Sequence, residues 1–384
     1  MKTGWQTSSL GDVLATIKNG LNCKQDKSGI GQKISRIESI SLASFDLLRV
    51  GYAEISDSEK SKFKLIKGDI LFSHINSPIH VGKTAVFDAD EDVYHGVNLL
   101  LMRPVAAVDS AYLEFFLKYL FDTGYWRKTC KQSVNQASVN QQDISRVPFS
   151  YPTDHKEQQR IVTLLDKAFD GIATAKAHAE KNLQNARALF ASHVQSVFNR
   201  TGNGWTTKKL NQISQNLDSK RIPITKSDRK SGEYRYYGAS GIVDYVDGYI
   251  FDGDTLLVSE DGANLLARST PIAFSVSGRY WVNNHAHILK FESMATQRCV
   301  EFYLESIPLD DYITGAAQPK LNQQALNSIP ISIPDTIYEQ QKVVDEIEAL
   351  SEQTERLENI YQQKLTALDE LKKTLLHRAF NGDL

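Results

Sequence analysis

Few residues of this chain have the types and spacing that an active site requires. His285 and His287, two positions apart, would share one face of a strand and could supply part of a metal site. Asp57, Glu59 and Lys60 offer carboxylates and a lysine, but their spacing is wrong for a nuclease and ISDSEKSK is typical of a solvated loop. We interpret the histidines as a polar strand face, so neither a metal site nor a catalytic residue is predicted.

Strong catalytic motifs are absent from the sequence. It contains no phosphate-binding GxxxxGK[ST], no GxGxxG between a strand and a helix, no HExxH, no GxSxG and no NPPY-type tetrapeptide of amino-methyltransferases. The three cysteines, Cys23, Cys130 and Cys299, are isolated and lack CxxC spacing, which indicates reduced thiols and no zinc. We therefore expect a protein that is not an enzyme and holds no cofactor of its own.

A basic stretch that contains tyrosines, Ser219 to Gly241, is the best candidate for binding a ligand. It holds six Lys and Arg residues against two acids, in a chain whose formal net charge is −2. Such a patch suits phosphates, and its tyrosines can pack on sugars or bases, while its glycines let the backbone approach a groove. A solvated, poorly ordered loop is the alternative. The DNA-binding residues predicted here and further along are Lys220, Arg221, Lys226, Arg229, Lys230, Arg235, Tyr237, Ser240 and Arg268.

A weaker patch of the same sign lies near the N-terminus. The stretch NCKQDKSGIGQKISR carries four basic residues against one acid, and SHINSPIHVGK adds donors and acceptors of the kind that read base edges. A structural loop is an equal alternative for any single residue. The DNA-binding residues predicted in this part are Lys24, Lys27, Lys33, Arg36, His74, Asn76 and Lys83.

The elements that position these residues occur twice. The stretch VNQQDISRVPFSYPTDHKEQQRIV at 139–162 returns as LNQQALNSIPISIPDTIYEQQKVV at 321–344, so that Asn140 recurs as Asn322, 182 positions later. The start GWQTSSL at 4–10 returns as GWTTKKL at 204–210, with an offset of 200. The first copy therefore has about 18 extra residues. Two copies of this length indicate a duplicated module with approximate two-fold symmetry.

Each copy ends in a long amphipathic segment. Apolar residues spaced mostly by four and three predict helices from about Lys156 to Phe198 and from about Tyr338 to Phe380, the second interrupted at Thr354. Each helix would be about 65 Å long, which suits a spacer. The two apolar stripes can bury each other, and we expect an antiparallel coiled-coil pair.

The segments before these helices are α+β in pattern. We predict buried strands within 63–87 and 249–266 and at 93–104 and 280–291, followed by short helices at Ala111 to Asp122 and Met294 to Ser306. The Gly68-Asp69 step corresponds to Gly253-Asp254. At 384 residues, 41% apolar and 23% charged, the chain can form two or more domains. The absence of a long apolar run or a signal peptide indicates a cytoplasmic protein without membrane partners.

With these features together, the chain resembles the specificity subunit of Type I restriction-modification systems. The tails GAAQPKLNQQALNSIPISIPDTIYEQQKVV and VNQASVNQQDISRVPFSYPTDHKEQQRIV carry the resemblance, with the Trp-led repeat starts and both long helices in the expected order. The resemblance covers nearly the whole chain. The first tail departs from the pattern, because Gln136-Ala137-Ser138-Val139 stands where the second has Gln318-Pro319-Lys320-Leu321.

The resemblance implies two target recognition domains, at 1–152 and 201–334, with spacer helices at 153–200 and 335–384. The implied partners are double-stranded DNA, two copies of an adenine methyltransferase subunit that carries S-adenosylmethionine, and a restriction translocase subunit. Base flipping would give the methyltransferase access to adenine N6. The residues expected to bind these partner subunits are Gln158, Gln159, Gln340 and Gln341.

Because the two variable segments share little sequence, we predict an asymmetric bipartite DNA target with half-site centres about 10 bp apart and an unread spacer of about 5 to 8 bp. An interaction scaffold without DNA specificity is the main alternative. A restriction-enzyme fragment or self-sufficient nuclease is the third, and the missing motifs argue against it.

Overall fold

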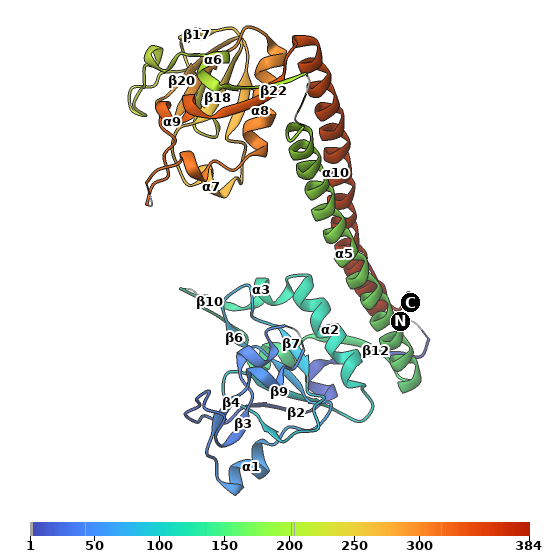
Figure 1. Ribbon diagram of the computed structural model, residues 1–384. Coiled ribbons are helices and arrows are strands. Elements are labelled where there is room, and N and C mark those ends of the chain that lie inside the picture. The colour runs from blue at the N-terminus through green and yellow to red at the C-terminus, as the bar shows by residue number, and fades with distance from the viewer. Residues whose placement is uncertain (1–2, 43, 135, 201, 203, 316) are drawn as a thin grey trace. The chain divides into compact units, whose positions relative to one another are not determined.

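The computed structural model describes residues 3–42, 44–134, 136–200, 202, 204–315 and 317–384, and it contains two compact units. Unit 1 comprises Met1–Ala179 and Gln363–Leu384, and unit 2 comprises Glu180–Gln362. Each unit combines one globular α+β part with one half of each of two long helices, α5 and α10 (Figure 1). The predicted α+β class with an internal repeat is confirmed, whereas the four domain boundaries stay a prediction.

Unit 1 contains the strands β1 (Trp5–Ser9), β2 (Leu14–Asn19), β3 (Gln32–Ile34), β4 (Gly51–Ala53), β5 (Ile70–Phe72), β6 (Ile75–Asn76), β7 (Thr84–Val86), β8 (Val93–Tyr94), β9 (Leu100–Pro104), β10 (Lys131–Ser133), β11 (Gln136–Ser138) and β12 (Pro148–Pro152). Its helices before α5 are η1 (Leu10–Val13), η2 (Ile37–Ile40), η3 (Leu47–Arg49), α1 (Asp57–Phe63), α2 (Ser110–Asp122), α3 (Tyr125–Thr129) and α4 (Gln141–Ser145). The central antiparallel sheet has the order β2-β9-β5-β7. Ile70 and Met102 of this sheet share a buried core with Tyr112 and Phe116 of α2, so α2 covers one face.

Unit 2 contains the strands β13 (Trp205–Lys209), β14 (Gln215–Asn216), β15 (Ser231–Gly238), β16 (Gly241–Val246), β17 (Phe251–Asp252), β18 (Thr255–Ser259), β19 (Ala273–Val276), β20 (Arg279–Val282), β21 (Ala286–Lys290) and β22 (Pro330–Pro334). Its short helices are α6 (Leu210–Ile213), η4 (Asp218–Lys220), α7 (Asn264–Ala267), α8 (Met294–Ser306), η5 (Asp310–Tyr312) and α9 (Gln323–Ser328). The central sheet β14-β21-β18-β19 is again antiparallel. Leu256 and Leu289 of this sheet pack with Val300 and Leu304 of α8.

The two units share a four-stranded central sheet, a second sheet with one parallel strand pair and a two-stranded ribbon, whereas the sheet β10-β11-β6 of unit 1 has no counterpart among the described strands of unit 2. A second sheet pairs β3 with β8 in parallel in unit 1, and β15 with β20 in parallel in unit 2. The Trp-led strand pairs with the proline-bounded strand in equal register, Trp5 opposite Pro152 and Trp205 opposite Pro334. Gly68 and Gly253 both have a positive φ before the central strand, at 87° and 117°, a conformation that glycine adopts without strain. The duplication read from the sequence is therefore a duplication of structure.

The long helices α5 (His155–Phe198) and α10 (Ile337–Asn381) match the predicted ranges to within one residue at each end. Within unit 1, Ile161 and Leu165 of α5 pack with Leu376 and Phe380 of α10. Within unit 2, Val197 of α5 packs with residues near the start of α10. The helices are therefore antiparallel in both units, as predicted.

Ion pairs flank the helix contact in both units. Lys176 pairs with Asp369 at 2.7 Å in unit 1, and Arg187 pairs with Glu358 at 2.8 Å in unit 2. Thr354, where the apolar pattern breaks, is 8% exposed and its hydroxyl donates to the Leu350 carbonyl at 2.8 Å. The helix itself thus satisfies the polar group at that position.

Two details of the sequence reading were wrong. The apolar runs at 93–104 and 280–291 are each two strands, β8 with β9 and β20 with β21, because the chain turns between them. ISDSEKSK contains the helix α1, whose start is capped by Ser56 and Glu59, rather than a loop. The short helices α2 and α8, by contrast, begin and end within one residue of the prediction.

Two further expectations concern the cysteines and the membrane. All three cysteines are free thiols, as predicted. Within the ranges that the structure describes, no helix is long and apolar enough to cross a bilayer.

Candidate nucleic-acid interface

The repeated tail sequence forms the same local structure in each unit. Asn140 caps α4 by accepting from the Asp143 N–H at 2.8 Å, and Asn322 caps α9 by accepting from the Ala325 N–H at 2.9 Å. Side-chain capping satisfies backbone donors that a helix start leaves unpaired. The recurring Asn of both tails is therefore structural and fixes the path of the chain.

The glutamine pairs of both tails divide into one buried and one exposed residue each. Gln158 is fully buried and bonds three backbone groups, accepting from Asp109 N–H at 2.8 Å and donating to the carbonyls of Ala107 and Pro152 at 2.9 Å. Gln340, 5% exposed, donates to the Pro334 carbonyl at 2.9 Å and accepts from Thr296 Oγ1 at 2.6 Å.

These bonds correct two predicted partner contacts. Gln158 and Gln340 lock each long helix to its own globular part, so their side chains are occupied inside the protein. Gln159 and Gln341 are exposed. They remain available to a partner subunit, although Gln341 also donates to Asp345 at 2.7 Å.

The basic stretch of unit 2 is an anchored loop followed by the hairpin β15–β16. Tyr236, fully buried, accepts from the Ile224 N–H at 3.1 Å, and Trp281 Nε1 donates to the Ile222 carbonyl at 2.6 Å. Arg229 stacks on the Tyr236 ring at 4.4 Å from its centroid and pairs with Asp244 at 3.2 Å. The loop therefore has a defined path, and the alternative of a poorly ordered loop is contradicted.

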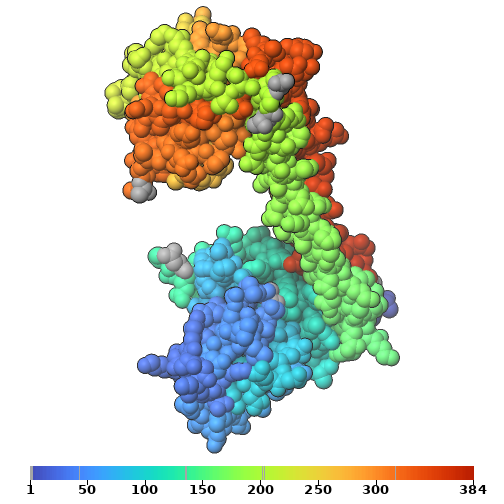
Figure 2. All heavy atoms as spheres, in the orientation of Figure 1, coloured from blue at the N-terminus to red at the C-terminus, as the bar shows by residue number. Residues whose placement is uncertain are grey.

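The structure separates the predicted DNA contacts of this stretch into two groups. Tyr237, 6% exposed, packs in the core beside Tyr280, so its ring cannot stack on a base. Arg221 and Arg229 are bonded within the unit. These three predicted contacts are therefore corrected to internal roles. The exposed remainder consists of Lys220, Lys226, Lys230, Arg235 and Ser240, and in Figure 2 the yellow-green atoms of this stretch form part of the outer surface of unit 2.

Arg268 is likewise an internal residue. Its guanidinium donates to the carbonyls of Leu304 at 3.2 Å and Ile307 at 2.9 Å, and its backbone has a φ of +49° at the end of α7. Burial lowers the pKa of Arg268, and the neighbouring Glu305 opposes that shift. The side chain therefore closes a turn against α8, which corrects its prediction as a DNA contact.

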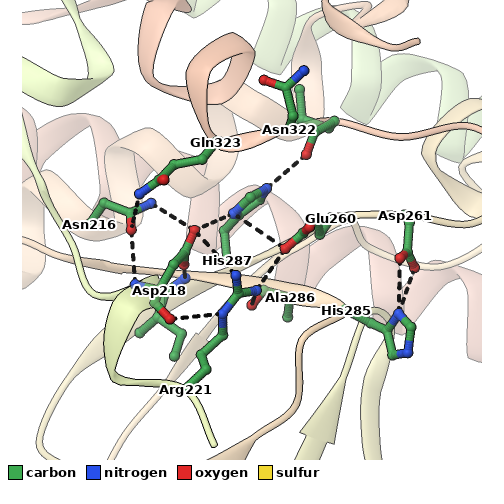
Figure 3. A network of polar contacts seen from close by, with 12 residues as sticks. Asn216, Asp218, Arg221, Glu260, Asp261, His285, Ala286, His287, Asn322 and Gln323 are labelled. Carbon is green, nitrogen blue, oxygen red and sulfur yellow. Dashed lines mark hydrogen bonds and ion pairs between the residues drawn. The ribbon is translucent and has the colours of Figure 1, made fainter. Parts of the chain in front are cut away.

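A network of charged side chains, most of them buried, lies where the basic stretch of unit 2 begins, next to η4 (Figure 3). We call the segment from Arg221 to Lys230 the basic loop. Asp218 Oδ2 lies 2.6 Å from His287 Nδ1, and Arg221 Nη1 donates to Glu260 Oε2 at 2.7 Å and to the Ala286 carbonyl at 2.9 Å. Lys320 pairs with the other oxygen of Glu260 at 3.2 Å. Burial alone would raise the pKa of the Asp218 and Glu260 carboxyls, but hydrogen bonds and the nearby positive charges outweigh it and lower both.

The two candidate metal ligands are not on one strand face. His287 lies in β21, buried, and bonds Asp218 and the Leu321 carbonyl, whereas His285 precedes that strand, about half exposed, and contacts Asp261 at 2.9 Å. His285 belongs to the turn between β20 and β21, and its side chain lies beside Asp261, away from His287 (Figure 3). Among the described residues no group of three or more potential ligands could hold a metal ion.

In unit 1 the predicted basic residues are largely paired with carboxylates. Lys27 and Arg36 both approach Glu38, at 3.3 and 3.5 Å, and Lys33 pairs with Glu91. Lys24 is exposed, and it is the one predicted lysine or arginine of this stretch that forms no ion pair within the described residues. The patch is therefore less basic than its sequence indicates.

The other three predicted contacts of unit 1 are also used within the fold. His74 is 9% exposed and burial lowers its pKa, so it is a neutral, covered ring rather than a base-reading side chain. Asn76 donates to Ser73 Oγ at 3.0 Å, and Lys83 donates to the Ser41 carbonyl at 3.0 Å. Asn76 and Lys83 remain partly exposed, whereas the prediction for His74 is corrected.

The sequence reading included Tyr234 among the tyrosines of the basic stretch but missed the exposed residues that lie with it, Tyr249 and Arg279. Tyr234 and Tyr249 lie with ring centroids 5.0 Å apart, and the Arg279 guanidinium stacks on Tyr249 at 4.8 Å while bonding Asp252 at 3.1 Å. Such surfaces can stack on bases or contact phosphates. No local sequence signal could have found this group, because Arg279 and Tyr249 meet only through the pairing of β17 with β20.

Comparisons with known proteins agree with this arrangement. A family model described as the Type I restriction modification DNA specificity domain matches residues 2–184 and again 202–367. The MjaX type I restriction enzyme specificity subunit of Methanocaldococcus jannaschii is 27% identical over 99% of this chain and 93% of its own length.

Two solved structures share the fold. A chain from a structural study of complex assembly and conformational transition of the type I restriction-modification system aligns over 100% of this chain and 99% of its own, with a TM-score of 0.78 at 14% identity. The HsdS subunit of Thermoanaerobacter tengcongensis aligns over 100% of this chain and 98% of its own, with a TM-score of 0.66 at 15% identity. The chain, with its two matched specificity domains and a specificity subunit related over nearly its full length, belongs to the Type I restriction-modification specificity family, whose members are specificity subunits rather than enzymes.

Proposed function

We propose that this protein reads an asymmetric bipartite DNA sequence, one half-site with each unit, and docks two adenine-N6 methyltransferase subunits and a restriction translocase. S-adenosylmethionine bound by the methyltransferase supplies the methyl group. The protein itself contributes sequence selection and placement of those subunits on DNA.

The observation that carries this proposal is that the two units share the same local structure around the repeated tails but present different surfaces. Both units repeat the Trp-to-Pro strand register, the Asn cap and the buried Gln. The surfaces of the two units differ. Unit 2 has an anchored basic loop and a hairpin, whereas most of the predicted lysine and arginine side chains of unit 1 form ion pairs with carboxylates. Equivalent local structures suit two equivalent partner subunits, and different surfaces suit two different half-sites.

DNA binding itself is tested by its salt dependence. Each Lys or Arg that neutralises a phosphate adds about 0.9 to the magnitude of the slope of log K against log salt. Charge removal at Lys226 and Lys230 (Lys→Gln) is expected to lower that slope by about one per residue. Lys373→Gln is the matched control, since Lys373 is exposed on α10 and pairs with Glu370. A slope near zero for the unmodified protein would instead favour an interaction scaffold.

The spacing between the half-sites is assigned to the helix pair. We expect half-site centres about 10 bp apart with about 5 to 8 unread base pairs between them. One heptad inserted into each helix, after Ala179 and after Gln362 where the two units meet in sequence, adds roughly 10 Å of helix.

That length corresponds to about three base pairs of B-DNA. The methylated motif is therefore expected to keep both half-sites and to gain about three base pairs between them. A heptad inserted into α5 alone is the control, because it lengthens one helix without its partner while keeping the apolar stripe on the same face. An unchanged spacer in the double-insertion protein would contradict this role of the helices.

A further inference from the structure

The charge network of unit 2 contains a buried histidine whose two ring nitrogens both contact oxygen atoms. His287 Nδ1 faces a carboxylate oxygen of Asp218 at 2.6 Å, and Nε2 faces the backbone carbonyl of Leu321 at 2.7 Å. A carbonyl oxygen only accepts, and Asp218 already accepts from the Ile288 N–H at 2.8 Å. The ring therefore links Asp218 of η4 to Leu321, the first residue of the repeated tail.

The network joins four segments that are distant in sequence. Asp218 and Arg221 belong to η4 and the start of the basic loop, Glu260 follows β18, His287 lies in β21, and Lys320 precedes the repeated tail. Asn216 extends the network by donating to Asp218 at 3.1 Å, and Gln323 of the tail donates to Asn216 at 2.7 Å. Figure 3 shows the side chains of Asn216, Asp218, Arg221, Glu260 and His287 lying close together, with Gln323 of the tail beside Asn216.

Arg221 sets where the basic loop leaves the body of the unit. Its side chain, 15% exposed, is held by three oxygens: the Asp218 carbonyl at 3.1 Å, Glu260 at 2.7 Å and the Ala286 carbonyl at 2.9 Å. The next residue, Ile222, is held in turn by Trp281. The exposed Lys220, Lys226 and Lys230 lie on either side of these two anchors in sequence.

Unit 1 builds the same sheet without this network. Phe72 lies opposite Leu100 in the first sheet as Leu257 lies opposite Ile288 in the second. In this register the counterpart of His287 is Leu99, which is fully buried and apolar.

The fold therefore does not need the charges. Buried ion pairs are often no more stabilising than apolar residues of similar size, and their best-attested use is to fix one geometry.

We propose that the Asp218–Arg221–Glu260–His287 network is a positioning device for recognition of the second half-site. It holds the basic loop and the Glu260–Asp261 turn in the one arrangement that fits the bases of that half-site. These residues act through the loop and do not themselves contact DNA. This inference rests on the proposed function, because it assumes that unit 2 reads one half-site.

The test uses the full chain in complex with its methyltransferase subunit and a panel of DNA duplexes with single base changes in either half-site. Arg221→Lys keeps the charge but cannot satisfy the same three oxygens from a planar fork. We expect the ratio of kcat/KM for cognate against altered second half-sites to fall about tenfold, the loss of roughly one base contact. The same ratio for the first half-site should stay within about twofold, the usual scatter of such comparisons.

Two further variants separate positioning from folding. Glu260→Gln keeps an acceptor for Arg221 and is milder, so it serves if Arg221→Lys lowers the melting temperature of unit 2 below the assay range. Arg103→Lys is the matched control, since Arg103 makes a two-oxygen pair with the buried Asp69 of unit 1, at 2.6 and 2.8 Å, away from any basic loop. It should lower stability without changing discrimination at the second half-site.

The outcomes are distinct. A selective loss of discrimination at the second half-site supports the inference. Unchanged discrimination in folded Arg221→Lys and Glu260→Gln proteins, or an equal loss at both half-sites, would overturn it. If the unmodified complex methylates no bipartite sequence at all, the proposed function fails and takes this inference with it.

Discussion

Replacing Gln158 by alanine is expected to destabilise unit 1 by about 3 kcal/mol, because one buried side chain satisfies three backbone groups there. Each lost hydrogen bond costs about 0.5–1.5 kcal/mol net, and a buried group left without a partner costs about 1–3 kcal/mol. The largest part of this cost comes from the Asp109 N–H, because it lies at the start of α2 and loses its acceptor. For a unit of this size the melting temperature should fall by roughly 6–12 °C.

Gln159→Ala provides the control at the adjacent position. Gln159 is exposed, and a surface change of this kind usually stays within about 0.5 kcal/mol. Because the chain has two units, the assay is hydrogen exchange of the α2 segment together with thermal unfolding, rather than a single two-state fit.

Partner binding is measured on the same proteins. We expect Gln159→Ala to weaken methyltransferase docking at unchanged stability. Equal stability of the two variants, or a Gln158→Ala protein that loses partner binding without loss of stability, would refute the structural assignment.

Three other predictions concern stability. Asn322→Ala should destabilise unit 2 by about 1 kcal/mol, because α9 loses its cap; an unchanged melting temperature would contradict this. Glu114→Gln should stabilise unit 1 by about 1 kcal/mol at neutral pH, since burial raises the pKa of the Glu114 carboxyl despite its ion pair with Lys118. That gain should shrink as the pH falls and the native carboxyl takes up its proton, which thermal unfolding across pH 4–8 would follow. Asp218 and Glu260, whose pKa values are lowered, stabilise unit 2 above their unfolded values of 3.8 and 4.5. This contribution should be lost below about pH 4, and Asp218→Asn should flatten that acid limb in exchange measurements.

The long elements could be predicted from the sequence because their signals repeat over many residues. Apolar spacing over more than forty positions defined α5 and α10 to within one residue. Apolar residues that recur at spacings of three and four likewise placed the short helices α2 and α8 to within one residue. The apolar runs at 93–104 and 280–291 were each misread as one strand, because hydrophobicity alone does not mark where a buried chain turns.

The site was less predictable because its determinants are partners distant in sequence. Charge counting could not distinguish Arg221, bonded to Glu260, from the exposed Lys226. The repeat marked both glutamines of each tail without saying which is buried. Helical spacing could have distinguished the buried glutamine from the exposed one. Gln158 lies three residues before the buried Ile161, and Gln340 lies three residues before the buried Val343, so the first Gln of each pair shares the buried face of its helix.

The central claim is tested most directly by methylome sequencing of a host that expresses this protein with its methyltransferase subunit, compared with the methyltransferase subunit alone. The account predicts a single bipartite N6-methyladenine motif that occurs only when both are present, with two different half-sites and an unread spacer of about 5 to 8 bp. An active methyltransferase that yields no such motif, or the same motif without this protein, would contradict it.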